Sequence, residues 1–289
     1  MTQQELLREG TAALRAAHVP EPELDARYLL LEAFHMDLAH LLAAQHRELL
    51  TDEETAGKCS RFRRLVGLRA ERIPLQHLTG VQEFMGFEFH VNEAVLIPRQ
   101  DTETLVELVL EEQKDKDICL LDVCTGSGCI AISLALMGGY REVAGLDISE
   151  AALLVAEENA GRLLAGHDGR FSLVRSDMFA NVGREEQFDV IVSNPPYIPT
   201  SVIEGLEPEV RDHEPRLALD GTEDGLKFYR ILAEKGSCHL KPGGSIYMEI
   251  GFDQAEAVEA MFAGYGFEDV ATIKDLAGLD RVVRATWND

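Results

Sequence analysis

Cysteine is scarce in this chain of 289 residues, and none of its five cysteines belongs to a Cys-x-x-Cys pair. An odd number of cysteines without such a pair indicates neither a disulfide framework nor a zinc site. We therefore expect reduced, mostly buried thiols and no bound metal. The residues concerned are Cys59, Cys119, Cys124, Cys129 and Cys238.

Long apolar runs are missing as well. No segment approaches the roughly 18 uninterrupted apolar residues that a membrane span requires. The first ten residues, MTQQELLREG, also lack the charged and then apolar layout of a secretory signal. These absences predict a cytoplasmic protein with no membrane partner. Nothing in the pattern demands an oligomer, so we expect a monomer.

Basic residues are few relative to acidic ones, with 27 Lys and Arg against 51 Asp and Glu. Residues 1–75 carry 10 basic and 12 acidic groups, a net charge of −2, whereas residues 76–289 carry 17 and 39, a net charge of −22. A surface of this sign repels phosphate backbones, so we expect no stable nucleic-acid partner. We interpret most of the negative charge as a contribution to solubility. The more specific alternative is that it attracts a basic protein partner.

Residues 3–72 carry apolar side chains at three- and four-residue spacing, which is typical of amphipathic helices. Breaks at 19–22 and near Thr51 divide this stretch into three or four helices. At the second break Thr51 resembles an N-cap, with Glu54 three residues later. Residues 1–75 are therefore predicted to form a small all-helical domain.

Arginines gather near the end of this domain. Residues 61–72 hold five arginines against a single acid, Glu71. A run of this kind is more often the solvated side of a helix than a docking face, so we favour the solvated side. A docking face is the alternative.

The pattern changes after residue 75. Near-alternating aromatic residues and turn residues between 84 and 91 predict a β-hairpin, so we interpret residues 76–99 as a β-hairpin linker. Over residues 100–289 short apolar runs alternate with helical patterns, which predicts an α/β domain with a mostly parallel, doubly wound sheet. The expected strands are 118–123, 142–146, 171–174, 188–192 and 245–250, followed by an antiparallel edge pair at 270–273 and 282–285.

A glycine-containing turn follows the first of these strands. Gly126 and Gly128 stand where the strand gives way to a helix, and they let the backbone pass close to a ligand. The next strand ends at Asp147, whose carboxylate can accept the hydroxyl hydrogens of a ribose. These features predict a nucleoside-bearing cofactor, although a tight turn without a ligand is the simpler alternative. Residues 126–131 also fit a dinucleotide fingerprint, so NAD stays open, while Asp122 favours the cationic S-adenosylmethionine.

The fourth strand ends in Asn194-Pro195-Pro196-Tyr197. In an open α/β sheet this end faces the same crevice as the glycine turn. A conjugated nitrogen is a weak nucleophile, so a site must hold its hydrogens, and the Asn194 side-chain oxygen and the Pro195 carbonyl could accept them. Tyr197 offers an aromatic wall for a planar group. We interpret the tetrapeptide as catalytic rather than as a proline turn that merely ends a strand.

These motifs stand in a longer series that resembles the HemK/PrmC release-factor glutamine methyltransferases. The resemblance covers nearly the whole chain, and the segments before the glycine turn are its most particular part. The matching segments are 74–80 (PLQHLTG), 83–84, 95–99 (VLIPR), 102–103, 125–128 (TGSG), 147–149 (DIS), 176–177, 193–198 (SNPPYI), 224–226 (DGL), 240–244 (LKPGG), 249–251 (EIG) and 274–276 (KDL).

The resemblance implies a fold and an activity. The fold is a Rossmann-like, seven-stranded class I methyltransferase domain preceded by a small all-helical domain, which docks the release factor, and a β-hairpin linker. The activity is methyl transfer from S-adenosylmethionine, giving S-adenosylhomocysteine, to the glutamine of the factor's Gly-Gly-Gln loop. Asn194 to Tyr197 would clamp the glutamine amide, and Asp177 and Met178 would lie by the adenine. The implied cofactor-binding residues are Cys124, Thr125, Gly126, Ser127, Gly128, Asp147, Asp177, Met178 and Asn194.

The sequence departs from the family pattern at three places. Cys124 replaces the usual glycine, which is harmless if φ is negative there. Met178 stands where an aromatic residue is frequent, so adenine packing is expected to be looser. Residues 100–101 read Gln-Asp instead of Pro-Glu.

Two other functions fit part of the sequence. An adenine amino-methyltransferase of nucleic acid also has a planar, conjugated target, but the −22 charge of residues 76–289 disfavours it. A degenerate methyltransferase fold that serves only as a binding module would not need the glycine turn, the ribose acid and the amide clamp together. Lack of affinity for S-adenosylmethionine would favour that module.

Overall fold

The computed structural model describes residues 1–44, 46–167 and 169–288. Position 45 of the predicted helical domain, and positions 168 and 289 of the predicted methyltransferase domain, lie outside the described residues. The chain folds into two compact units, one formed by Met1–Val81 with Glu207–His213 and the other by Gln82–Leu206 with Glu214–Asp289. None of the described helices is both long and apolar enough to cross a membrane.

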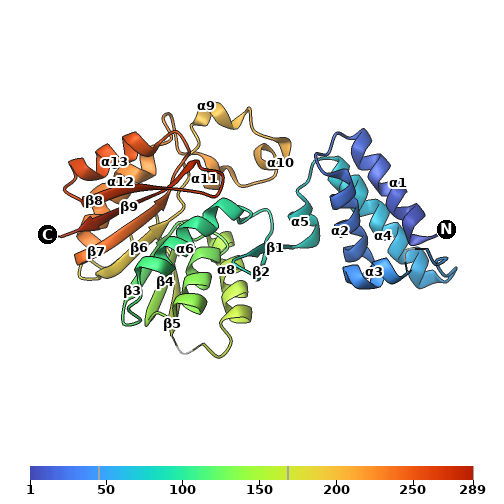
Figure 1. The fold of residues 1–289 in the computed structure, drawn as a ribbon, viewed down its shortest axis with the longest axis horizontal. Helices are drawn as coiled ribbons and strands as arrows, with labels where there is room; N and C mark the ends of the chain where they lie inside the picture. Colours follow the sequence, from blue (N-terminus) through green and yellow to red (C-terminus); the bar gives the residue numbers. More distant parts are fainter. Residues whose placement is uncertain (45, 168, 289) are drawn as a thin grey trace. The chain divides into compact units, whose positions relative to one another are not determined.

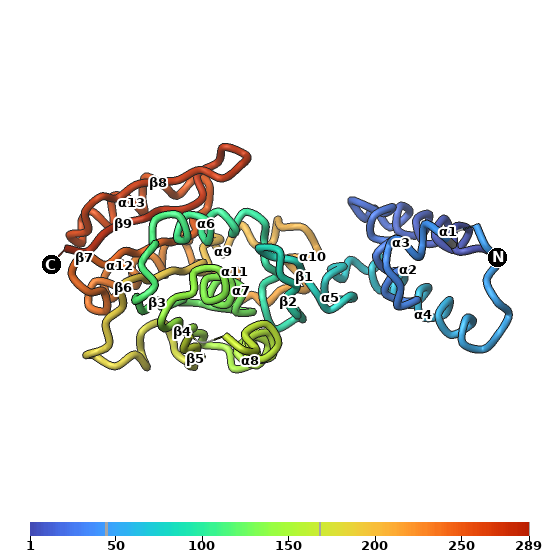
Figure 2. The backbone as a smooth tube through the Cα atoms, turned by 60° about the horizontal axis from the view of Figure 1, so that its bottom comes forward, coloured from blue at the N-terminus to red at the C-terminus, as the bar shows by residue number. Residues whose placement is uncertain are grey.

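The first unit is helical, as the sequence predicts (Figures 1 and 2). Helices α1, α2 and α4 pack against one another around a core that includes Leu6, Leu29 and Phe62. Gly10 allows the close approach of α1 to α4, because a Cβ atom there would lie 2.5 Å from the Phe62 ring. The helices are α1 (Gln3–Ala16), α2 (Pro22–Phe34), α3 (Leu38–Ala44), α4 (Glu53–Ala70), α5 (Leu75–Thr79) and α10 (Pro208–Arg211).

The start of α4 differs from the prediction. Asp52, not Thr51, is the N-cap, and its carboxylate accepts a 2.7 Å hydrogen bond from the backbone N–H of Thr55. A carboxylate at this position satisfies an otherwise unpaired N–H and also interacts favourably with the positive end of the helix dipole. The predicted cap was wrong by one residue.

The arginines of 61–72 are not one solvated helix side. Arg69 is only 5% exposed, and it forms ion pairs with Asp25 at 2.7 Å and with Glu209 of α10 at 2.8 Å. Arg72 also pairs with Glu209. Arg63 and Arg64 are exposed, as predicted, and Arg61 and Arg72 are partly buried in ion pairs, so the prediction of a solvated side was wrong outright only for Arg69. Buried guanidinium groups of this kind require partners, and acids distant in sequence provide them.

The second unit contains a seven-stranded sheet with the strand order β5-β4-β3-β6-β7-β9-β8 within the described residues. Strands β5, β4, β3, β6 and β7 are parallel, and β9 and β8 close one edge in antiparallel pairing, as predicted. A separate β1–β2 hairpin precedes the sheet. The strands are β1 (Val81–Phe84), β2 (Phe87–His90), β3 (Cys119–Val123), β4 (Glu142–Asp147), β5 (Arg170–Arg175), β6 (Phe188–Ser193), β7 (Leu240–Glu249), β8 (Glu268–Lys274) and β9 (Asp280–Trp287).

The sheet is buried on both faces, because successive side chains of a strand point in opposite directions. Leu120 of β3 belongs to one apolar core with α6 and α7, and the next residue, Leu121, belongs to a second core with α12 and α13. Figure 1 shows helices on either side of the sheet. The helices of this unit are α6 (Glu103–Glu112), α7 (Cys129–Ser133), α8 (Glu150–Leu163), α9 (Thr200–Ile203), α11 (Arg216–Leu219), α12 (Lys227–His239) and α13 (Ala255–Gly264), with short helical turns at η1 (Gln100–Thr102) and η2 (Leu134–Gly138).

Strand β3 marks the point where the strand order reverses. The chain runs from β3 through β4 to β5 on one side, and then returns to place β6 on the other side of β3. Ligand crevices of open α/β sheets form outside the carboxyl ends of strands at such a reversal. The sheet topology therefore directs attention to the ends of β3, β4 and β6.

Candidate active site

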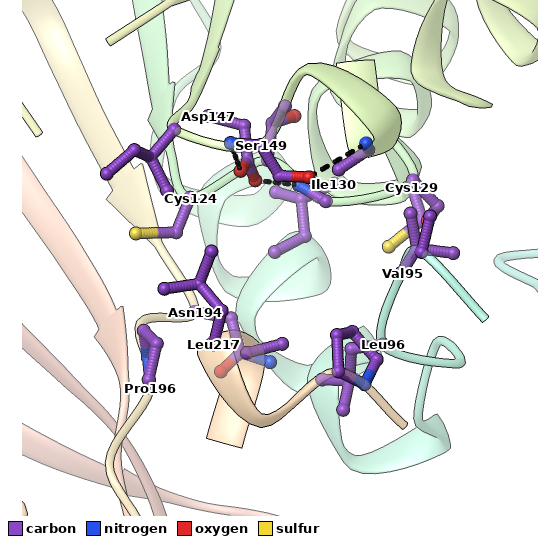
Figure 3. A pocket seen from close by; sticks show the side chains of 18 of the residues that line it. Val95, Leu96, Cys124, Cys129, Ile130, Asp147, Ser149, Asn194, Pro196 and Leu217 are labelled. Atoms are coloured by element: carbon purple, nitrogen blue, oxygen red, sulfur yellow. Dashed lines mark hydrogen bonds between the residues drawn. The ribbon is translucent and has the colours of Figure 1, made fainter. Parts of the chain in front are cut away.

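A pocket lies where β3, β4 and β6 end. Sheet register aligns these ends, because Val123 of β3 pairs with Leu146 of β4 and with Ser193 of β6. The residues that follow Val123 and Ser193, together with Asp147 at the end of β4, therefore leave the sheet in one row. Figure 3 shows Asp147, Cys124 and Asn194 around the cavity. Of the site residues predicted from the sequence, Cys124, Thr125, Gly126, Ser127, Asp147, Asp177, Met178, Asn194 and Pro196 line the pocket.

Three of the predicted residues are not among those that line the pocket. Gly128, with a φ of +80°, caps the start of α7, and a Cβ atom there would lie 2.9 Å from Ile132 and 3.2 Å from Ala156 of α8. Its role in the fold is thus close packing of the turn. Pro195 is buried, and the Tyr197 hydroxyl points to Glu249.

Asp147 is held by two backbone groups. Its Oδ2 accepts a 2.9 Å hydrogen bond from Gly126 N–H, and its Oδ1 accepts a 2.8 Å bond from Ser149 N–H, as the dashed lines of Figure 3 indicate. Each carboxylate oxygen can accept more than one hydrogen bond, so both oxygens keep capacity for a hydroxyl of a bound nucleoside. Burial raises the pKa of Asp147, and the bonds from Ser149 and Gly126 oppose that rise.

The position of Asp122 differs from the prediction, which placed this residue beside the cationic cofactor. Its side chain is fully buried and is not among the residues that line the pocket. Its Oδ2 accepts a 2.7 Å hydrogen bond from the Thr125 hydroxyl, so Asp122 stabilises the glycine turn. Burial raises the pKa of Asp122 to about 7, while the bond from Thr125 lowers it.

Cys124 and Met178 form one wall of the pocket. Their sulfur atoms lie 3.7 Å apart, and both residues have left-handed backbone, with φ of +66° at Cys124 and +49° at Met178. The sequence analysis considered Cys124 harmless only if its φ was negative. The structure contradicts this condition, because the turn that follows β3 passes through the left-handed region at Cys124. Burial raises the pKa of the Cys124 thiol well above its usual range, so the thiol is neutral.

Asn194 has an amide group facing the pocket from the end of β6. Its Nδ2 donates a 3.2 Å hydrogen bond to the Thr102 hydroxyl, and no described residue donates to its Oδ1. A free carbonyl oxygen at a pocket wall can accept a hydrogen from a planar amide or amine. This is the arrangement that an amide clamp needs.

Several pocket residues were not identified from the sequence. Arg99 stands at the wall, and its Nη2 donates to both oxygens of Glu214, at 2.8 and 2.7 Å. That carboxylate precedes the segment that carries Leu217 into the pocket, and burial raises its pKa while Arg99 opposes the rise. Arg99 and Thr102 occur in segments that carry the family resemblance, which was a usable signal. The remaining unpredicted lining residues include Pro215, Leu217, Ala218, Lys227 and Phe228, for which no local motif exists.

A doubly wound sheet with a glycine turn, a ribose acid and Asn-Pro-Pro-Tyr at adjacent strand ends defines a class I S-adenosylmethionine-dependent methyltransferase. The pocket fits this cofactor, since Asp147 keeps free acceptor capacity and the buried Ser127 hydroxyl has no hydrogen-bond partner among the described residues. A methyltransferase from Pyrococcus furiosus has the same fold, with a TM-score of 0.53 and 18% identity over 71% of this chain and 91% of that one.

Sequence comparison gives the family. The family model described as the PrmC N-terminal domain matches residues 5–80, and the methyltransferase small domain matches residues 100–204. The release factor glutamine methyltransferase of Geobacter sulfurreducens is 43% identical over 92% of this chain and 89% of its own length. The protein of the same name from Moorella thermoacetica is 43% identical over 97% of both chains.

The chain belongs to the release factor glutamine methyltransferase family. It is an enzyme, and S-adenosylmethionine is its methyl donor. These relationships confirm the resemblance stated from the sequence. They also favour a protein-glutamine target over adenine in nucleic acid, and an enzyme over a binding module.

Proposed function

We propose that this protein methylates the side-chain amide nitrogen of the glutamine in the Gly-Gly-Gln loop of peptide chain release factors. The observation that carries the proposal is the position of Asn194, whose free Oδ1 faces the same pocket as Asp147 in a chain of this family. The strongly acidic residues 76–289 make adenine in nucleic acid a poor substrate.

The chemistry depends on orientation. Bound S-adenosylmethionine supplies an electrophilic methyl group on a sulfonium sulfur, which is a good leaving group. Asn194 Oδ1 and the Pro195 carbonyl accept the two hydrogens of the substrate amide, which aims its nitrogen at the methyl group. Tyr197 is not among the residues that line the pocket, and its place beside the planar amide is part of this proposal. No strong base is required, because the methylated nitrogen can lose its proton to water afterwards.

The cofactor is held by the turn after β3 and by the strand ends beside it. Asp147 accepts hydrogens of the ribose, and Asp177 and Met178 flank the adenine. Cys124, Thr125, Gly126, Ser127 and Gly128 shape the turn that passes the cofactor, with Gly128 acting through packing. Asn194 borders both the cofactor and the substrate amide.

The parts of the chain have separate roles in this proposal. Residues 1–75 dock the release factor, residues 76–99 form the β-hairpin linker, and residues 100–289 carry out methyl transfer. Since release factors act on ribosomes in the cytoplasm, we place the enzyme there. We propose that it works as a monomer without stable nucleic-acid or membrane partners.

Mass spectrometry of an unmethylated release factor tests the proposal. The factor is incubated with the full chain and S-adenosylmethionine, and its Gly-Gly-Gln peptide is sequenced. We expect one added methyl group on the glutamine with the wild type. Asn194→Ala should give little transfer, and the matched variant Asn288→Ala, whose side chain bonds Glu268 at the surface, should behave as the wild type.

Calorimetry with S-adenosylhomocysteine completes the test, because it reports whether the cofactor site is intact. If the wild type binds this product but leaves the glutamine unmodified, the release-factor assignment is wrong. Equal transfer by Asn194→Ala and wild type would instead exclude the amide clamp.

A further inference from the structure

Asn159 is a fully buried polar residue of α8, and no predicted site motif includes it. Its Nδ2 donates to two backbone carbonyls, those of His90 and Ser127, each at 3.0 Å. Its Oδ1 accepts a 2.7 Å hydrogen bond from the His90 N–H. Both amide hydrogens and the amide oxygen are therefore used.

An asparagine at this position of α8 is unfavourable for the helix itself. Asparagine is a poorer helix former than alanine, and a buried amide is costly unless its groups are paired. The other buried residues of α8 are all apolar, namely Ala152, Leu153, Val155 and Ala156. A single polar residue among them indicates that its hydrogen bonds are needed, and one of these bonds reaches the glycine turn.

The bond to Ser127 fixes one peptide unit of that turn. Asn159 holds the Ser127 carbonyl, and the N–H of the same peptide unit, which belongs to Gly128, donates to the Thr125 carbonyl at 2.9 Å. A planar peptide unit that is held at both polar groups cannot flip without breaking both bonds. Ser127 lines the pocket, whereas Asn159 is not among the lining residues. Asn159 therefore acts on the pocket through the turn.

The other two bonds of Asn159 attach the end of the β-hairpin. His90 is the last residue of β2, and its N–H and C=O pair with the Asn159 amide as they would with a neighbouring strand. The chain that follows β2 reaches the pocket, where Val95 and Leu96 line the wall (Figure 3). Val95 also packs in a small apolar core with Val155 of α8. One helix thus supports both the turn and this wall.

We propose that Asn159 is a positioning residue for S-adenosylmethionine, because it holds the Ser127–Gly128 peptide and the end of the hairpin in one fixed arrangement. The hairpin is then a structural part of the cofactor site and not only a linker. This inference rests on the proposed function in that the glycine turn holds the cofactor. It does not depend on which group accepts the methyl.

The hairpin keeps other attachments to α8 when Asn159 is replaced. Arg162 donates to the Glu88 carbonyl, and the His90 ring lies 2.7 Å from Glu158 Oε1. A substitution at 159 therefore removes the buried hydrogen bonds while the hairpin stays beside α8. Alanine and leucine also favour the helix more than asparagine does.

Calorimetry with S-adenosylhomocysteine compares Asn159→Ala and Asn159→Leu with the wild type. Both variants leave the Ser127 carbonyl without its donor, so Kd should rise by about 10- to 100-fold in each. Leucine has the same number and branching of side-chain heavy atoms as asparagine, so a role in packing alone would be largely kept by Asn159→Leu. At saturating S-adenosylmethionine, kcat for a release factor should stay within about threefold of the wild type.

Two matched variants control for a loss of stability. Tyr140→Phe removes another buried donor, which gives a 3.0 Å hydrogen bond to the Gln113 carbonyl. Tyr140 precedes β4, at the end of that strand opposite to the pocket. Glu158→Ala removes an exposed carboxylate next to Asn159 on α8. Both variants should bind S-adenosylhomocysteine with wild-type affinity.

Amide hydrogen exchange reads the glycine turn without any ligand. The Gly128 N–H should exchange at least about tenfold faster in Asn159→Ala than in the wild type, because its peptide unit is then held on one side only. Tyr140→Phe should leave this rate unchanged. Wild-type affinity in Asn159→Ala would overturn the inference, as would wild-type affinity in Asn159→Leu alone.

Asp147→Ala tests the proposed cofactor site itself. If this variant binds S-adenosylhomocysteine as tightly as the wild type, the assigned cofactor site is wrong, and unchanged Gly128 exchange in Asn159→Ala would then separately reject the positioning role. If the wild type binds S-adenosylhomocysteine but does not methylate the release factor, the proposed substrate is wrong. The role of Asn159 is then decided by the affinities and the exchange rates alone.

Discussion

The sulfur atom of Cys124 lies 3.7 Å from that of Met178 at the wall of the pocket. Both residues adopt left-handed backbone, a region that costs a non-glycine residue about 1 kcal/mol or more. The pocket wall thus stores strain in two adjacent side-chain-bearing residues. Such strain is open to direct measurement by substitution.

Cys124→Gly should raise the free energy of unfolding by up to about 1 kcal/mol, since glycine adopts a φ of +66° freely while losing some backbone entropy on folding. Cys124→Val should lower it by roughly 2 kcal/mol, because a β-branched residue is strongly disfavoured there. Urea denaturation of both variants, with Cys238→Val at an exposed position as control, provides the comparison. Equal stability of the Gly and Val variants would show that the backbone at 124 is unstrained.

Asp122 should make stability fall as pH rises from about 4 to about 7. Its folded pKa of about 7 exceeds the ordinary value of 3.8, so over this window the folded state holds a proton that the unfolded state has lost. The slope from one such group is at most about 1.4 kcal/mol per pH unit. Asp122→Asn cannot titrate, so the stability difference between variant and wild type should grow in favour of the variant across this window. A difference that stays constant between pH 4 and 8 would contradict the buried, protonatable carboxyl.

Arg69→Ala should destabilise the helical unit by about 3 to 5 kcal/mol. The substitution leaves the buried Asp25 without its guanidinium partner, while the partly buried Glu209 keeps only Arg72. Arg63→Ala is the matched control, because its pair with Glu9 is about half exposed and should contribute roughly 0.5 kcal/mol. Denaturation followed by helical circular dichroism measures both. Similar losses for the two variants would mean that burial of the Arg69 cluster adds nothing.

Gly225→Ala should lower activity by at least about tenfold and stability by about 2 kcal/mol. Gly225 has a φ of +74°, and a Cβ atom there would lie 2.7 Å from Gln254 Nε2 and closer still to the Tyr197 carbonyl oxygen. The segment that carries the proposed amide clamp would have to move. Gly161→Ala in α8, where a Cβ meets nothing within 4 Å, should instead stabilise by about 0.5 to 1 kcal/mol. If Gly225→Ala transferred methyl groups as fast as the wild type, Tyr197 would be shown to tolerate displacement.

Much of the fold was predictable, because the relevant signals are local. Apolar runs bounded by turn residues identified each strand of the sheet, and the short connection before β9 identified the antiparallel pair. The cap of α4 was misplaced because Thr51 and Asp52 are both good caps, and only the backbone path selects between them. Arg69 looked solvated because its partners Asp25 and Glu209 lie far from it in the sequence.

The candidate site likewise contains residues that local motifs predicted and residues that they did not. The glycine turn, Asp147 and Asn194 were recognisable because each combines a residue type with a position at a strand end. Leu217 and Phe228 reach the pocket through tertiary folding, which no spacing reveals. The sign of φ at Cys124 is a property of the assembled turn, so the sequence could state the condition but not its outcome.

The helical unit is completed by Glu207–His213, a piece of chain that is synthesised long after α4. During translation Arg69 and Arg72 therefore emerge from the ribosome well before Glu209, and their acidic partner arrives only when most of the sheet strands have also been made. An amino-terminal unit usually matures first on a nascent chain. Here its final ion pairs have to wait, so a truncated product ending near residue 81 would carry a buried arginine with only Asp25 to neutralise it.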